Sequence, residues 1–159
     1  MLQRRGGRLV VLIGWNEYVD IPAWGIRGLR AKVDTGARSS ALHVDDVREL
    51  PHGRVCFDVV LHREKRDRRI HVETAIRRRG RVRSSDGRYS ERIFVSVPVR
   101  IGPVEREIEL SLVDRQRMIF RMLLGRTALA GHFLIDPSRQ QLLGRPARRR
   151  RRAAPGPGS

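Results

Sequence analysis

Cysteine is almost missing from this chain of 159 residues, because Cys56 is the only one. No disulfide can form within one chain, and a zinc site built from several thiolates of one chain is excluded. A reducing, cytoplasmic setting is therefore the expected localisation.

Aromatic residues and long apolar runs are also scarce. Phe, Trp and Tyr make up 5% of the chain, so the core must be built largely from Val, Ile and Leu, which favours strands. No stretch of the sequence approaches the length of a membrane-spanning helix. The apolar run Leu9–Trp15 follows basic residues, but it is too short for a signal peptide and lacks a small-residue cleavage site, so we expect a first strand there.

Acidic residues are outnumbered, 17 against 34 Lys and Arg, and the net charge is +17. The excess is concentrated in two segments. Residues 77–92 carry seven arginines against Asp86 and Glu91, a net charge of +5, and residues 145–152 carry six arginines and no acid. Such a field attracts nucleic acid, an acidic membrane surface or an acidic peptide. A merely solvated surface is the alternative, and composition does not separate these interpretations.

Alternation of apolar and polar residues predicts an all-β, antiparallel domain. The turn signal Asp86-Gly87 predicts that residues 77–92 form a projecting hairpin, and Arg126–Gly131 is the one helical stretch. The expected strands are Leu9–Ile13, Trp15–Ile21, Leu29–Val33, Ala41–Val44, Val55–Leu61, Ile70–Ile76, Ile93–Ile101, Val104–Leu112 and Phe133–Ile135, with Leu142-Leu143 pairing at an edge. We therefore expect a basic lead over 1–8, a β domain over 9–144 and a disordered Arg-rich tail over 145–159.

The stretch Lys32–Leu42 has the pattern of a strand, a tight loop and a second strand, and its loop presents Asp34, Thr35 and Gly36. A strand that ends in a carboxylate can display a general acid or base. Gly36 would allow a backbone conformation closed to other residues, and the Thr35 hydroxyl could bond to nearby backbone. Ordinary turn residues are the alternative interpretation of these three positions.

Four strings of the sequence favour a catalytic loop over an ordinary turn. They are Lys32–Arg38, Ser40–His43, Val82–Ser85 and Phe120–Arg126. Together with Gly14-Trp15, Ile21-Pro22 and Gly25-Ile26 they resemble the bacterial family of retropepsin-like aspartic endopeptidases, long labelled ATP-dependent zinc proteases and associated with glutamate ligases. The resemblance covers roughly Val10–Gly144. This chain departs from the family's pattern at Ser39, where we expect Thr, and at Asp86, where we expect Asn.

The resemblance implies a closed or partly closed β-barrel of the retropepsin, single-lobe acid-protease type, with one short C-terminal helix. It implies that Asp34, Thr35 and Gly36 are catalytic, and that the strand of Leu123, Leu124 and Gly125, with Arg126, supports their loop. The hairpin would act as a flap, and the substrate-binding residues would be Ala37, Arg78, Arg81, Arg83, Ser84 and Ser85. Because one chain holds a single Asp-Thr-Gly, we expect a homodimer whose two Asp34 carboxylates share one proton. Asp114 and Asp136 are the alternative second carboxylates.

A flap rich in arginine favours an acidic substrate, and the resemblance suggests glutamate-rich peptides or protein tails. Neither zinc nor ATP is supported, because His43, His52, His62, His71 and His132 form no zinc motif and no Gly-rich Lys-Ser/Thr loop is present. His43, nine residues after Asp34, could line the substrate pocket. The competing interpretation is a non-catalytic basic domain that binds RNA or the ribosome, with non-specific nucleic-acid contact through the tail.

Overall fold

The computed structural model describes residues 2–62, 68–84, 86–114 and 119–146, and the elements below lie in those ranges. The basic tail from residue 147 onward and Ser85 lie outside the described residues. The elements are β1 Leu2–Arg5, β2 Arg8–Ile13, β3 Asn16–Ile21, the 3₁₀ turn Pro22–Trp24, β4 Ile26–Val33, β5 Ser40–Leu50, β6 Arg54–Val60, β7 Arg69–Ala75, β8 Arg78–Arg83, β9 Tyr89–Ile101, β10 Val104–Val113, β11 Met122–Leu124, α1 Arg126–Leu129 and β12 Phe133–Ile135.

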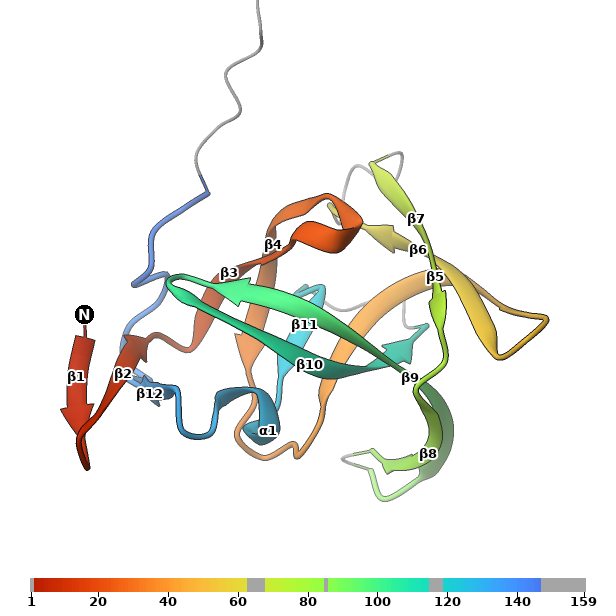
Figure 1. Ribbon diagram of the computed structural model, residues 1–159. Helices are drawn as coiled ribbons and strands as arrows, with labels where there is room; N and C mark the ends of the chain where they lie inside the picture. Colours follow the sequence, from red (N-terminus) through yellow and green to blue (C-terminus); the bar gives the residue numbers. More distant parts are fainter. Residues whose placement is uncertain (1, 63–67, 85, 115–118, 147–159) are drawn as a thin grey trace, which may run out of the picture.

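Six strands form a partly closed barrel (Figure 1). They pair in the order β10, β9, β3, β4, β11 and β5, and β5 then pairs with β10. The prediction of an all-β, barrel-like domain with one short helix is therefore confirmed in the described residues. The expectation of purely antiparallel pairing was wrong, since β4–β11, β5–β10 and β2–β12 are parallel pairs.

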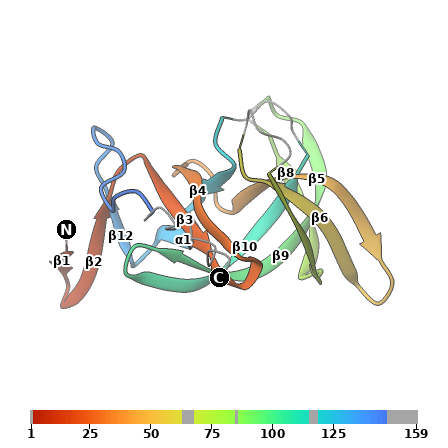
Figure 2. The same ribbon diagram turned by 90° about the horizontal axis from the view of Figure 1, so that it is seen from above.

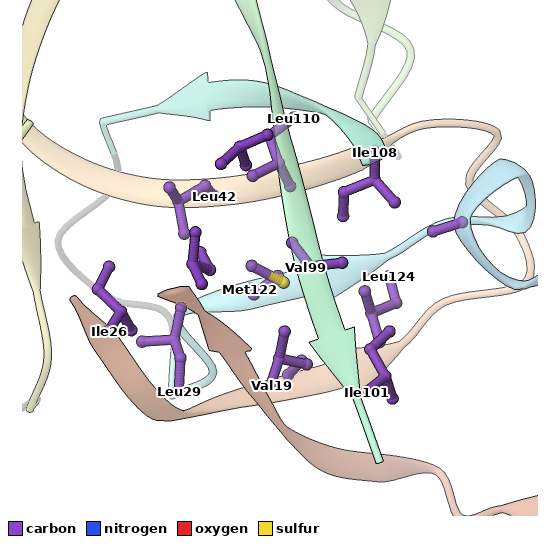
Figure 3. Packing of buried hydrophobic residues seen from close by; sticks show 14 of the residues in the cluster. Val19, Ile26, Leu29, Leu42, Val99, Ile101, Ile108, Leu110, Met122 and Leu124 are labelled. Carbon is purple, nitrogen blue, oxygen red and sulfur yellow. The ribbon is translucent and has the colours of Figure 1, made fainter. Parts of the chain in front are cut away.

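The barrel interior is filled by branched aliphatic side chains (Figure 3). Val19, Ile26, Leu42 and Leu110 are fully buried, and Met122 and Leu124 of β11 reach the same cluster. Burial of this kind contributes about 1.5–3 kcal/mol for each large side chain. A core with few aromatic residues therefore rests on interdigitated Val, Ile and Leu, as the composition predicts.

Two smaller units extend the barrel at opposite ends (Figure 2). At one end β5 continues into the β6–β7 hairpin, which the alternation predicts and in which Val55, Phe57 and Val59 are fully buried. At the other end β1, β2 and β12 form a three-stranded sheet. The basic lead thus contains a strand that pairs along β2.

The chain after β12 is fastened to the β2–β3 turn by a buried carboxylate. Glu17, 1% exposed, accepts hydrogen bonds from the backbone N–H groups of Gly14 (2.8 Å), Leu142 (3.0 Å) and Leu143 (3.0 Å). The expected edge pairing of Leu142-Leu143 was wrong, because these amides bind a side chain and belong to no strand. Within the described ranges, no helix is long and apolar enough to cross a membrane.

Candidate active site

The loop that carries Asp34 is held from below by β11. β4 and β5 are consecutive in the chain and the loop joins them, while β11 lies between them and pairs with both. Leu124 is the register partner of Val33, and Leu123 is the partner of Lys32 and Ala41. A strand bonded on both sides is rigid, so the residues that enter and leave the loop are fixed relative to one another.

Two contacts bring the loop close to the end of β11. The Asp34 amide donates to the Leu124 carbonyl (2.9 Å), and the Gly125 amide donates to Ser40 Oγ (3.0 Å). A Cβ atom at Gly125 would lie 2.5 Å from the carbonyl carbon of Ser39, closer than the 3.0 Å that real Cβ atoms keep. Glycine is therefore required at position 125 by the close approach of the loop backbone.

The start of α1 satisfies the loop's carbonyl groups. The amides of Arg126 and Thr127 donate to the carbonyls of Ala37 (2.8 Å) and Arg38 (3.1 Å). The Arg126 guanidinium donates from Nη1 to the Thr35 carbonyl (2.9 Å), and the Thr127 hydroxyl also donates to Arg38 (2.9 Å). Thr127 was not among the predicted site residues, although its place at the start of the one predicted helix was a usable signal. Three loop carbonyls are thus held by two residues.

The Asp34 carboxylate is half-buried, and its Oδ1 accepts a hydrogen bond from the Gly36 amide (3.1 Å). Two expectations for the loop were wrong. Gly36 does not have a positive φ, and a Cβ there would instead approach Asp34 Oδ1 at 3.2 Å. The Thr35 hydroxyl makes no hydrogen bond within the described residues, and it is the carbonyl of Thr35 that is bound, by Arg126. The glycine therefore leaves room beside the carboxylate.

Asp34 opens onto a cleft of about 910 Å³. Its lining comes mainly from the Asp34 loop, from β10 and from the β8–β9 hairpin. The cleft brings together Asp34, Gly36, Ala37, Arg78, Arg81, Arg83, Ser84 and Leu123 of the predicted site residues. Thr35, Leu124, Gly125 and Arg126 do not line it, since they lie under or beside the loop, and Ser85 is outside the described residues.

The cleft is strongly charged. Its lining has a net charge of +2, from five arginines, Arg38, Arg78, Arg81, Arg83 and Arg92, and three acids, Asp34, Glu107 and Glu109. Arg38, Arg92 and the two glutamates were not among the site residues predicted from the sequence. The glutamates could have been found, because Glu107 and Glu109 alternate with the buried Ile108 and Leu110 and so share the outward face of β10.

Neither glutamate is left without a partner. Glu109 accepts from Nε (2.8 Å) and Nη2 (2.6 Å) of Arg78, and Glu107 accepts from Ser96 Oγ (2.6 Å). The alternative carboxylates lie elsewhere. Asp136 follows β12 directly and accepts hydrogen bonds from the hydroxyl and the amide of Ser138, and both bonds lower its pKa, the hydroxyl more than the amide. Asp114 lines a separate, smaller cavity.

The histidines do not assemble a metal site. Within the described ranges, no group of three or more His, Cys, Asp or Glu side chains could hold a metal ion. His43 is buried on β5 and does not line the cleft, contrary to its suggested place in the pocket. His71 Nδ1 lies 2.8 Å from Asp58 Oδ1 on the β6–β7 hairpin. The described donor sets therefore do not fit a catalytic zinc ion.

Comparison with known proteins gives three findings. A family model described as RimB-like, the retropepsin-like aspartic endopeptidase RimB, matches residues 12–146. Curated relatives from Shewanella halifaxensis and Shewanella pealeana, each named "Probable alpha-L-glutamate ligase", are 34% identical over 136 residues. These residues are 84% of this chain and 30% of each relative, so the chain spans about a third of the relatives' length.

A solved structure has the same fold. It is a protein of unknown function from Legionella pneumophila subsp. pneumophila str. Philadelphia 1, with a TM-score of 0.69 and 24% sequence identity. The similarity covers 83% of this chain and 97% of the Legionella chain.

Proposed function

The chain belongs to the RimB-like family of retropepsin-like aspartic endopeptidases, and we propose that it hydrolyses peptide bonds in acidic, glutamate-rich peptides or protein tails. The observation that carries the proposal is the position of Asp34, which lines a positively charged cleft on a loop fixed by β11 and α1. The proposal includes a barrel of the retropepsin type and a cytoplasmic setting. Neither zinc nor ATP is part of it.

The second catalytic carboxylate comes from a second copy of the chain. Arg78 and Ser96 bind the other two acids of the cleft. Asp34 accepts a single side-chain hydrogen bond among the described residues, from the Gly36 amide to Oδ1. Two Asp34 residues facing each other across a two-fold axis would complete one site. Two carboxylates so close cannot both ionise, so the pair shares one proton near neutral pH.

The shared proton allows both halves of peptide hydrolysis. The ionised carboxylate takes a proton from water as the water oxygen attacks the scissile carbonyl carbon, and the protonated carboxylate donates its proton to the carbonyl oxygen. The tetrahedral diol then collapses. The carboxyl group that took the water proton passes it to the leaving nitrogen, while the partner, now ionised, takes a proton from one diol hydroxyl. The C–N bond breaks, and an acid and an amine are released. The Gly36 amide and the Arg126-bound carbonyl of Thr35 keep Asp34 in place during these transfers.

Acidic substrates are favoured by the arginines of the cleft, since guanidinium groups bind carboxylates through two parallel hydrogen bonds. The names of the curated relatives support the same substrate class. A glutamate ligase makes products that contain glutamate. In those relatives, the part that is similar to this chain would therefore meet glutamate-containing products of the ligase. We therefore expect cleavage of polyglutamate-containing peptides well above that of neutral peptides, with a steep loss of rate as salt is raised.

The decisive experiment compares the wild-type chain with Asp34→Asn on a glutamate-rich peptide and on a neutral peptide of equal length. We expect Asp34→Asn to lower the rate by about 10²–10⁴-fold with unchanged folding. Unchanged cleavage in the variant, or no cleavage by either chain, would leave a non-catalytic binding domain as the better reading. RNA binding before and after removal of residues 148–159 would then test that domain directly.

The dyad has its own test. The wild-type and Asp34→Asn chains are unfolded together in equal amounts and then refolded. Random pairing then makes about a quarter of the dimers fully wild type. Activity should then fall to about a quarter of that of the same total amount of wild-type chain, but only to about half if each chain acts alone. A chain that stays monomeric at every concentration and still cleaves would overturn the dimer.

A further inference from the structure

The β8–β9 hairpin lies at the edge of the barrel (Figure 1). Its two faces differ in the contacts that their side chains make. Directly paired residues share a face, and side chains alternate along a strand. Arg78, Gly80 and Val82 therefore share one face with their partners Phe94, Arg92 and Ser90, which we call the Phe94 face. Arg81 and Arg83 share the other with Glu91 and Tyr89, which we call the Tyr89 face.

The Phe94 face is already occupied at the base of the hairpin. The Arg78 guanidinium lies 3.7 Å from the Phe94 ring centre and is bound by Glu109 of β10. A Cβ at Gly80 would lie 2.5 Å from Arg78 Nη1 and 2.9 Å from the Phe94 ring, so the glycine makes room for this stack. Arg78 is therefore a positioning residue that joins the hairpin to β10, and its charge is largely neutralised within the chain.

On the Tyr89 face, Arg79 is paired with Glu49, but Arg81 and Arg83 carry charge that no described carboxylate neutralises. The guanidinium carbons of Arg81 and Arg83 lie 5.0 Å and 5.8 Å from the centre of the Tyr89 ring, which is 59% exposed. In the part of the chain that the structure describes, no ion pair joins either arginine to a carboxylate, including Glu91 across from Arg81. Each cation is thus held by an aromatic ring while its hydrogen-bond donors stay available.

We propose that Arg81, Arg83 and Tyr89 form a docking surface for a carboxylate-rich segment of the substrate, and that this surface extends the cleft along the hairpin. The inference rests on the proposed function for its substrate class. Both arginines also line the cleft, so one extended peptide can continue from Asp34 onto this surface. β8 pairs with no described strand other than β9, which leaves its other edge open to an extended chain.

The spacing and the residue types of this docking surface favour a peptide over a nucleic acid as its occupant. Arg81 and Arg83 are two residues apart on a strand, so they match every second side chain of an extended peptide lying alongside. Exposed Tyr and Arg are the residues that most often anchor protein interfaces. Recognition of single-stranded nucleic acid relies on several stacking aromatics, and Tyr89 is the only aromatic residue on this face among the described residues.

The test measures binding in the Asp34→Asn chain, so that it does not depend on cleavage. A fluorescent peptide of twelve glutamates is titrated with this parent and with Arg81→Gln, Arg83→Gln, Glu91→Gln, Tyr89→Phe and Tyr89→Leu added. Arg88→Gln is the matched control, since its side chain is 90% exposed on the same hairpin and it removes the same charge. A single-stranded RNA of twelve nucleotides is titrated in parallel.

We expect Arg81→Gln and Arg83→Gln each to weaken peptide binding about fivefold to tenfold, and Glu91→Gln to strengthen it. Arg88→Gln should change it less than about twofold. Tyr89→Phe should leave binding unchanged, whereas Tyr89→Leu, which removes no charge, should weaken it because the arginines lose their ring. The proposal would be overturned if Arg81→Gln and Arg88→Gln had equal effects, or if the parent did not bind the peptide. It would also be overturned if the parent bound RNA more tightly than the peptide and the same variants lost that RNA binding. Peptide binding with this pattern but no cleavage by the wild-type chain would refute the proposed activity and keep the docking surface.

Discussion

The close approach of β11 to the Asp34 loop makes Gly125→Ala the sharpest test of how the site is held. The new Cβ would lie 2.5 Å from the Ser39 carbonyl carbon and 2.9 Å from the Arg38 carbonyl oxygen, both below the 3.0 Å limit. The loop backbone must therefore move by at least half an ångström, because its neighbours are main-chain atoms that no rotamer change can clear. We expect about 1–3 kcal/mol of lost stability from this overpacking.

The loop shift should also be visible in function. A displacement of an ångström at a reacting group can cost about a hundredfold in rate, so half of that should lower kcat about tenfold. Peptide hydrolysis measures kcat. Amide hydrogen exchange at Asp34 reports the same movement without catalysis, because that amide donates to the Leu124 carbonyl at 2.9 Å and should exchange faster in the variant.

Gly14→Ala is the matched control. Its Cβ would meet backbone atoms of Arg139 and Gln140, the latter at 2.6 Å, so the steric cost is similar, but Gly14 does not line the cleft. Both variants should lose similar stability, and only Gly125→Ala should lose kcat and protection of the Asp34 amide. If Gly125→Ala folds and keeps both at the wild-type level, the argument that β11 fixes the catalytic loop is refuted.

Three further predictions concern support of the loop, the buried carboxylate and pH. Arg126→Ala should lower kcat about tenfold with KM little changed, since the Thr35 carbonyl loses its donor. Arg126→Lys should recover part of the lost kcat. An unchanged kcat of Arg126→Ala in steady-state assays would contradict this role. Glu17→Gln should cost about 1–3 kcal/mol in urea unfolding, because an amide nitrogen cannot accept from Gly14 or Leu142, and equal stability would count against the clamp. Burial, followed by Arg106 and Arg8, lowers the pKa of His132, so the unfolded chain binds the proton more readily and stability falls as the pH drops through about 6.5. His132→Gln should lose less stability than wild type between pH 8 and pH 5 in thermal unfolding, and an identical pH dependence would refute the assignment.

The strands were predictable because a half-buried strand needs alternation, which is a local pattern. Val55, Phe57 and Val59 are fully buried as the pattern requires, and Asp86-Gly87 marks the turn between β8 and β9. The pairing partners were not predictable in the same way. β11 is three residues long and finds its place only because β4 and β5 leave a gap between them, which makes one of its two pairings parallel.

The partners of charged side chains were beyond the sequence for a similar reason. Arg78 and Glu109 are 31 residues apart, and Glu17 binds amides more than 120 residues away. Long polar side chains carry no periodic signal of what they will meet after folding. The sequence therefore presented the hairpin arginines as equivalent, whereas the register of β8 and β9 separates Arg78 from Arg81 and Arg83.

By itself, the sequence determined the strand content, the composition of the core, the family resemblance and the choice of Asp34 as the candidate acid, because each of these rests on neighbouring residues or on short strings. Only the tertiary structure decided that Gly36 is small to leave room beside Asp34, that Gly125 allows the loop to approach β11, and that Arg78 is joined to Glu109. These depend on distances between segments far apart in the chain, and only folding sets such distances.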